Sequence, residues 1–310
     1  MDAALGTAAA RFAEYGGAVV LFGAPLFFLY GLVGRDGRAA ARLGWPRWAY
    51  PGAALALLIG CALAVSAETA TMTDEPANAW RLSEIWRVVT GSAVGAGMGT
   101  RLTLAALGLL AGLLPGSFFQ RVLLTIMGGA ALASFAWTGH GAMDDGAAGA
   151  IHLGADLIHL LAAGLWLGAL GALLALSTSR KVQADLLALQ ALHTGLRRFA
   201  GAGTLAVALL VATGLVNSWF LIGPDHLPTL VSTLYGKLLL AKLALFAAML
   251  ILAAMNRYRH TPNLGAALLD RSPVRSLGSL QLSLAIETMV ALGVMALVGL
   301  LGTLAPASMA

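Results

Sequence analysis

The chain has 310 residues, of which 59% are hydrophobic and only 11% are charged. An ordinary soluble domain has roughly 45–50% apolar and about 25% charged residues, so this composition excludes a soluble enzyme. The apolar excess requires lipid around most of the chain. The net charge of +5 does not indicate a nucleic-acid partner, because Lys and Arg of membrane proteins collect in cytoplasmic loops.

Successive apolar stretches, each long enough to cross a bilayer as a helix, fill most of the sequence. They cover residues 13–33, 50–70, 94–114, 121–139, 150–176, 199–222, 235–256 and 279–304. The stretches are too long and continuous for barrel strands, and a bilayer core offers unpaired amides no water. The predicted fold class is therefore all-α, a polytopic integral membrane helical bundle of about eight transmembrane helices in a single domain over residues 1–310.

The distribution of basic residues predicts the orientation in the membrane. The connections after the first, third, fifth and seventh stretches carry Arg35, Arg38, Arg42, Arg47, Arg121, Arg180, Lys181, Arg197, Arg198, Arg257, Arg259, Arg271 and Arg275. The opposite side carries Arg11, Arg81, Arg87, Arg101 and Lys237, and most of the acids: Glu14, Asp74, Glu75, Glu84, Asp144, Asp145 and Asp225. Because Lys and Arg mark the cytoplasmic side, both termini are expected to be periplasmic.

Two connections have amphipathic patterns. Residues 71–93 form the longest outer connection, and their apolar spacing predicts a helix on the outer interface, anchored by Trp80 and Trp86. Residues 177–198 are also amphipathic, which predicts a helix along the inner surface.

The strongest functional signal is a group of polar residues in the fifth apolar stretch. His152, Asp156 and His159 are spaced i, i+4 and i+7, so they form one polar stripe on an otherwise apolar helix. His140 ends the preceding stretch, and Met143 follows in the short loop that leads back to the stripe. Spans joined by a short loop are usually neighbours, so these residues are expected to converge at the periplasmic side.

These residue types favour copper over other metals. A polar residue in a bilayer costs a few kcal/mol unless it is paired, so the stripe is a functional candidate. The single cysteine, Cys61, forms no CxxC motif, whereas imidazole and thioether groups together favour Cu(I). The predicted copper site consists of His140, His152, His159, Met143 and Asp156. Whether His226 takes part stays open.

Further charges within apolar stretches are Lys242, Glu287 and Glu68, the last near the outer end of its stretch. Lys242 has a predicted depth similar to that of Asp156, so the two can pair. Glu287 lies nearer the cytoplasmic half, where it can relay a proton or cation or simply bond to a neighbouring helix. Lys242 and Glu287 are the candidates for a pathway below the copper site.

Other functions remain open at this level. A b-type cytochrome would use histidines of facing helices as axial haem ligands. A membrane protein for copper delivery, redox chemistry or oxidase assembly would bind copper without transporting it. No GxSxG or HExxH motif is present, so we expect no enzymatic activity apart from a redox role at the copper site.

Residues 137–306 resemble the copper resistance protein D (CopD/PcoD) family. The resemblance rests on HLGADLIHLLAAGLWLGAL, RRFAGAG, VATGLVNSWFLIG, LYGKLLLAKLALFAAMLILAAMNRYR and LAIETMVALGVMALVGLLGTLAP in this order. It implies a multi-pass protein of the bacterial inner membrane that acts in copper homeostasis, binds copper and moves it from the periplasm toward the cytoplasm. It also implies a periplasmic copper-binding partner of the CopC type.

Overall fold

The computed structural model of the chain describes residues 2–139, 146–223, 228–270 and 272–304, and this part of the chain is helical without strands. Seven helices are long and apolar enough to cross a membrane, one of them continuing into the short helices that follow it. They are α1 (Asp2–Tyr30), α3 (Ala49–Thr73), α5 (Ala93–Gly112), α7 (Gly146–Thr178), α9 (Leu186–Leu221), α11 (Leu234–Met255) and α13 (Val274–Leu301). The shorter apolar helix α6 (Phe118–Ser134) lies in the fourth predicted span. The predicted polytopic helical bundle is confirmed.

Short helices connect or extend these spans. They are α2 (Gly34–Gly44), η1 (Pro76–Asn78), α4 (Leu82–Gly91), α8 (Arg180–Gln183), α10 (Thr229–Ser232), the π-helical turn η3 (Asn256–His260) and α12 (Thr261–Leu269). Helix α4 lies in the predicted amphipathic segment, and its Trp86 is exposed, as is Trp80 just before it.

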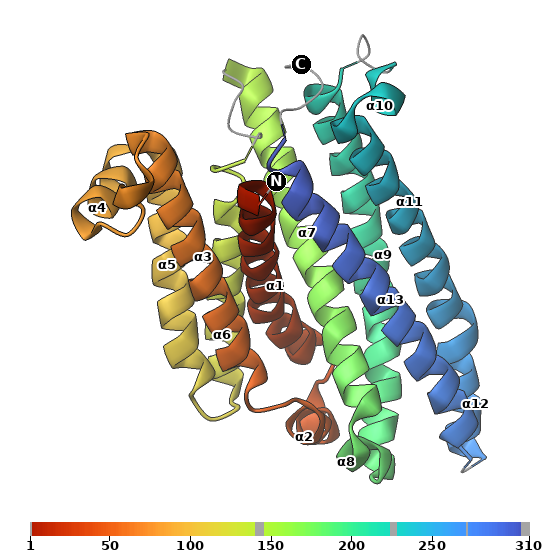
Figure 1. Cartoon of the computed structure of the whole chain (residues 1–310). Coiled ribbons are helices and arrows are strands. Elements are labelled where there is room, and N and C mark those ends of the chain that lie inside the picture. The colour runs from red at the N-terminus through yellow and green to blue at the C-terminus, as the bar shows by residue number, and fades with distance from the viewer. Residues whose placement is uncertain (1, 140–145, 224–227, 271, 305–310) are drawn as a thin grey trace.

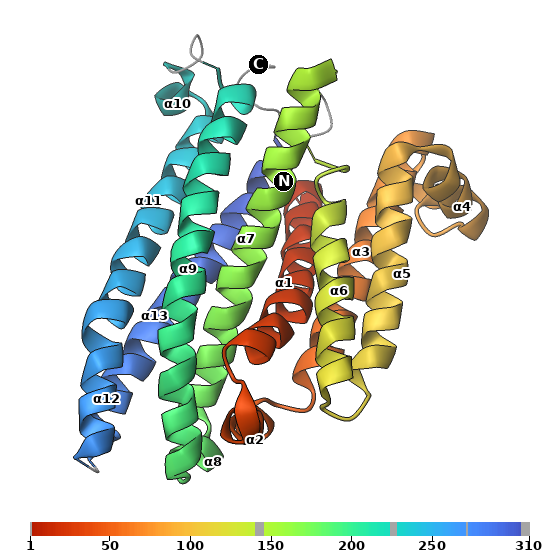
Figure 2. The ribbon, with the colours of Figure 1, turned by 180° about the vertical axis from the view of Figure 1, so that it is seen from behind.

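The helices form two groups that meet at α1 and α7. In Figures 1 and 2, α3, α5 and α6 lie on one side of this pair, and α9, α11 and α13 lie on the other. Helix α1 contacts α3, α6 and α7, while α7 contacts α9 and α13. The pair α1 and α7 is therefore the centre of the bundle.

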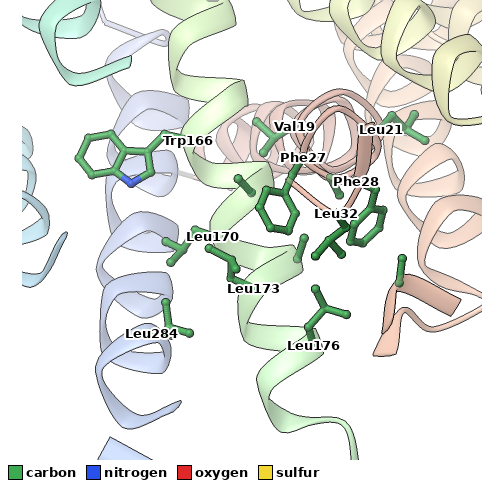
Figure 3. Close-up of a cluster of buried hydrophobic side chains, with 14 of the residues drawn as sticks. Val19, Leu21, Phe27, Phe28, Leu32, Trp166, Leu170, Leu173, Leu176 and Leu284 are labelled. Carbon is green, nitrogen blue, oxygen red and sulfur yellow. The ribbon is translucent and has the colours of Figure 1, made fainter. Parts of the chain in front are cut away.

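Small residues and large apolar side chains together build this centre. A Cβ on Gly168 of α7 would lie 2.5 Å from the Cα of Gly23 in α1, so the two backbones nearly touch. Toward the end of α1, the buried rings of Phe27 and Phe28 face Leu173 and Leu176 of α7 (Figure 3).

The two ends of the bundle differ in charge. Helices α2 and α8, the turn η3 and α12 lie at one end, here called the α2–α8 end, whereas α4 and α10 lie at the other, the α4–α10 end (Figure 1). Helix α1 begins and α13 ends toward the α4–α10 end. The basic residues of α2, α8 and η3 therefore gather at the α2–α8 end.

The prediction of a separate surface helix over residues 177–198 is wrong. Residues 186–198 belong to the same continuous helix as the sixth span, α9, and only the short α8 precedes it. Asp185 caps this helix, since its Oδ1 accepts hydrogen bonds from the backbone amides of Leu187 and Ala188. Leu189, Leu192 and Leu196 pack into the core, so the apolar face of the segment covers protein instead of lipid head groups.

Candidate metal centre

The polar stripe predicted from the sequence lies in the first half of α7. His152 is buried, with 2% of its surface exposed, while Asp156 and His159 are half-buried. The partners described below come from α9 and α11. The stripe therefore faces neighbouring helices, as expected for polar groups at membrane depth.

His159 forms a hydrogen bond with a side chain of α9. Its Nδ1 lies 2.9 Å from Oγ1 of Thr213, and that hydroxyl donates to the backbone oxygen of Leu209 at 2.6 Å. A hydroxyl has one proton to donate, so Nδ1 of the neutral ring must be the donor in its bond to Thr213. Nε2 of His159 then carries the lone pair that a metal ion needs.

The other two residues of the stripe also contact α9. The Nδ2 of Asn217 donates to Oδ1 of Asp156 at 3.4 Å. The ring of His152 stacks on that of Phe220, with centroids 4.6 Å apart and the planes 5° from parallel. Both contacts orient side chains of the stripe. The hydrogen bond from Asn217 involves only Oδ1 of Asp156 and not its Oδ2.

The three contact residues of α9 were missed at the sequence level, although a signal for them was present. Thr213, Asn217 and Phe220 are spaced by four and three residues, so they share one face of α9, as His152, Asp156 and His159 share one face of α7. Thr213 and Asn217 are polar residues in an apolar helix. This polar pair is the signal that could have identified this face of α9.

Lys242 of α11 approaches the same cluster from a third helix. It interacts electrostatically with Asp156 and with His159. Among the described residues, no ion pair within 4 Å joins Lys242 to Asp156. Their predicted pairing therefore stays a prediction.

The stripe alone is not a complete metal site. Within the described ranges, no group of three His, Cys, Asp or Glu side chains is placed to hold a metal ion. His140, Met143 and His226 lie outside the described residues, so their predicted participation stays a prediction. Gly139, the last described residue before that segment, lies beside Asp156, since a Cβ there would be 3.9 Å from Oδ2.

Glu287 lies farther from the α4–α10 end than the stripe does, and its carboxylate is hydrogen-bonded to residues of α7 and η3. The residue is buried, with 2% of its surface exposed. Trp166 of α7 donates to its Oε1 at 3.2 Å, and Asn256 of η3 donates to its Oε2 at 2.7 Å. These donors stabilise a carboxylate in an otherwise apolar interior.

A buried pair of opposite charges lies in the N-terminal half. Glu14 and Arg101 are each 2% exposed between α1 and α5, with 3.7 Å between Oε1 and Nη1. Arg101 also donates to Oγ1 of Thr138 at 3.0 Å, and its guanidinium lies 4.1 Å from the ring centre of Phe135. Opposite charges compensate each other here, so burial is tolerated.

The fold and the buried polar clusters define a class, a multi-pass helical membrane protein with ionisable groups inside the bundle. Comparison with known proteins narrows that class. Residues 1–150 match the family described as "Copper resistance protein D-like, N-terminal domain", and residues 193–301 match "Copper resistance protein D". The chain belongs to the copper resistance protein D family.

Individual relatives agree with this assignment. Copper resistance protein D of Pseudomonas syringae pv. tomato is 35% identical over 315 residues, which cover 96% of each chain. Inner membrane protein YebZ of Escherichia coli is 30% identical over 58% of this chain and 59% of its own. Copper transport protein CutJ of Bacillus subtilis is 34% identical over 39% of this chain and 21% of its own. No solved structure matches.

Proposed function

We propose that this chain captures copper at the α4–α10 end of the bundle, which faces the periplasm, and imports it toward the cytoplasm. Copper is the cargo in this proposal. His152, His159 and Asp156 supply ligands from α7, and His140 and Met143 complete the set. The family assignment already makes the chain a copper-related membrane protein.

The observation that carries the proposal is the hydrogen bond between Nδ1 of His159 and Thr213. Metal-binding histidines typically donate their other ring N–H to a neighbouring acceptor, which fixes the ring and makes the free nitrogen a better ligand. His159 has this arrangement in a half-buried position beside a carboxylate.

Import requires a route below the capture site. Lys242 adjoins the cluster, and Glu287 lies farther along the bundle, bonded to the same helix α7 through Trp166. The relative from Bacillus subtilis carries the printed name of a copper transport protein. A periplasmic copper-binding protein of the CopC type would deliver the ion, and no enzymatic step is required.

Copper titration of the purified protein tests the capture site. We expect the wild type to bind copper tightly, and His159→Ala and His152→Ala to weaken binding strongly, because each removes an imidazole ligand. His260→Ala is the matched control, because this histidine belongs to η3 at the α2–α8 end. Equal affinity in wild type and both stripe variants would contradict the proposal.

The same samples separate this proposal from its alternatives. A Soret band in the visible spectrum would favour a b-type cytochrome. Copper binding without copper uptake into vesicles would favour delivery, redox chemistry or assembly over import. Uptake that depends on His159 would support the full proposal.

A further inference from the structure

Two adjoining cavities enter the bundle between α9, η3 and α12. The first has a volume of about 260 Å³ and is lined by Trp166, Asn256 and Glu287 among other residues. The second has a volume of about 450 Å³ and is lined by residues of α9, η3 and α12. Both share Ala200, Arg257, Tyr258 and Thr261. They form an approach to Glu287 from the half of the bundle that contains η3 and α12.

Glu287 is thus a buried carboxylate that lines the first of two cavities bordered by η3. Along α7, Trp166 follows His159 by seven residues, which is about 10 Å at the rise of an α-helix. Trp166 points from α7 toward α13 (Figure 3), where it bonds to Glu287. The cavities therefore end about two helical turns from the candidate copper ligand.

The hydrogen bonds of Glu287 fit both of its protonation states. Trp166 can only donate, so Oε1 remains an acceptor in either state. Asn256, which is 7% exposed, donates through Nδ2 to Oε2, while its Oδ1 is buried and has no hydrogen-bond partner. When the amide turns over, Oδ1 faces Oε2 and accepts a hydrogen bond from the protonated carboxyl group.

The backbone at Asn256 supports such a role. The π-helical turn η3 begins at this residue, and π turns inside helices often mark functional sites. A buried acceptor without a partner costs free energy. The unpaired Oδ1 is explained if the amide has a second partner during function.

Few other charges face Glu287. Arg257 and Tyr258 of η3 are the ionisable residues that line the first cavity with it. Lys242 of α11 and His159 of α7 lie farther toward the α4–α10 end. Neither α12 nor residues 19–28 of α1, the part packed near this level, contains an ionisable side chain. The second cavity adds His193 and Arg197 of α9. Glu287 is therefore the carboxylic acid among the residues that line the two cavities.

Ligand chemistry argues against a second copper site at this position. Glu287 and Asn256 offer only oxygen atoms, which suit hard cations, whereas Cu(I) prefers sulfur and imidazole. A proton, unlike Cu(I), binds readily to a carboxylate oxygen. We propose that Glu287 binds a proton that enters through these cavities and that copper import, the proposed function on which this inference rests, is coupled to the transfer of that proton across the membrane.

The coupling cycle is balanced without a redox step. The carboxylate of Glu287 takes a proton from a hydronium ion in the cavity and becomes neutral, and Asn256 turns its oxygen toward the new O–H group. When the proton passes to a water molecule toward the α4–α10 end, the amide returns and donates again to Oε2. Each cycle carries one proton across the membrane in exchange for each copper ion that enters.

Infrared difference spectroscopy of the purified protein tests proton binding independently of transport. A shift of pH across the titration of Glu287 should produce the carbonyl band of a protonated carboxyl group. This band should vanish in Glu287→Gln and persist in the matched control Glu68→Gln, which changes a half-buried glutamate of α3. The glutamine variant can fold, because its amide can accept from Trp166 and donate to Oδ1 of Asn256.

Flux measurements test the coupling. Proteoliposomes with a trapped pH dye and a clamped membrane potential should show a luminal pH change whenever copper enters. Glu287→Gln should abolish this pH change while copper titration at the stripe stays unchanged. Asn256→Leu should reduce it, because the protonated state loses its acceptor.

The possible outcomes refute different claims. Wild-type copper uptake without proton movement, or full coupling in Glu287→Gln, would overturn the coupling and leave copper import intact. Absence of copper uptake by the wild type would overturn the import and the coupling with it. A carboxyl band that persists in Glu287→Gln would show that another group binds the proton.

Discussion

The orientation of the His159 ring depends on one hydroxyl group, that of Thr213. This hydroxyl accepts a hydrogen bond from Nδ1–H and donates one to the backbone oxygen of Leu209. Valine has nearly the shape of threonine but no hydrogen-bonding group. Thr213→Val should therefore weaken copper binding by about 10–100-fold, as expected for loss of an outer partner of a metal-binding histidine. Copper titration measures this change.

Thr194→Val is the matched control for this substitution. Thr194 belongs to the same helix and also donates to the backbone four residues earlier, at 3.0 Å, but it is exposed and far from the stripe. Its replacement should leave copper affinity unchanged. Equal losses in the two variants would mean that Thr213 acts through the helix and not through His159.

At the scale of elements, the contact between α1 and α7 depends on the absence of side chains. A Cβ on Gly168 would meet backbone atoms of Gly23 and Val19 at 2.5–2.7 Å, and backbone atoms cannot move aside cheaply. Gly168→Ala should destabilise the protein by about 1–3 kcal/mol, the usual cost of overpacking. Thermal unfolding in detergent measures the difference.

Gly171, one turn farther along α7, provides the comparison. A Cβ there has no heavy atom within 4 Å. Gly171→Ala should therefore leave stability unchanged or raise it slightly, because alanine favours a helix more than glycine does. A similar loss in both variants would show that helix flexibility, and not the close approach to α1, sets the effect.

At the scale of the whole molecule, the charge difference between the two ends predicts the orientation in the membrane. The arginine-rich α2 and α8 should face the cytoplasm. A cysteine at Gly116, in the exposed connection between α5 and α6, should resist a membrane-impermeant thiol reagent in intact cells. Ser83→Cys on the exposed part of α4 should react.

The native thiol does not interfere with this experiment. Cys61 is fully buried, so the wild type should show little labelling. Labelling of Gly116→Cys together with protection of Ser83→Cys would show that the orientation is the opposite of the predicted one. The proposed capture site would then face the cytoplasm.

The helical bundle and part of the candidate site could be predicted from the sequence. Long apolar stretches predict membrane helices almost independently of their neighbours, and seven of them are long enough in the structure to span a membrane. The spacing of His152, Asp156 and His159 placed them on one face because helical periodicity is a local property. The prediction of a surface helix over residues 177–198 was wrong because an amphipathic pattern does not distinguish lipid head groups from a protein partner.

The composition and local spacing of the sequence alone therefore determined the class of the protein, its helices and its polar stripe. Only the tertiary structure decided which helices supply the partners. Thr213 is 54 residues from His159, and Trp166 is 121 residues from Glu287. Glu14 and Arg101 likewise pair across two helices. Such contacts depend on the rotation of each helix about its axis and on close packing, which uniformly apolar stretches do not encode locally.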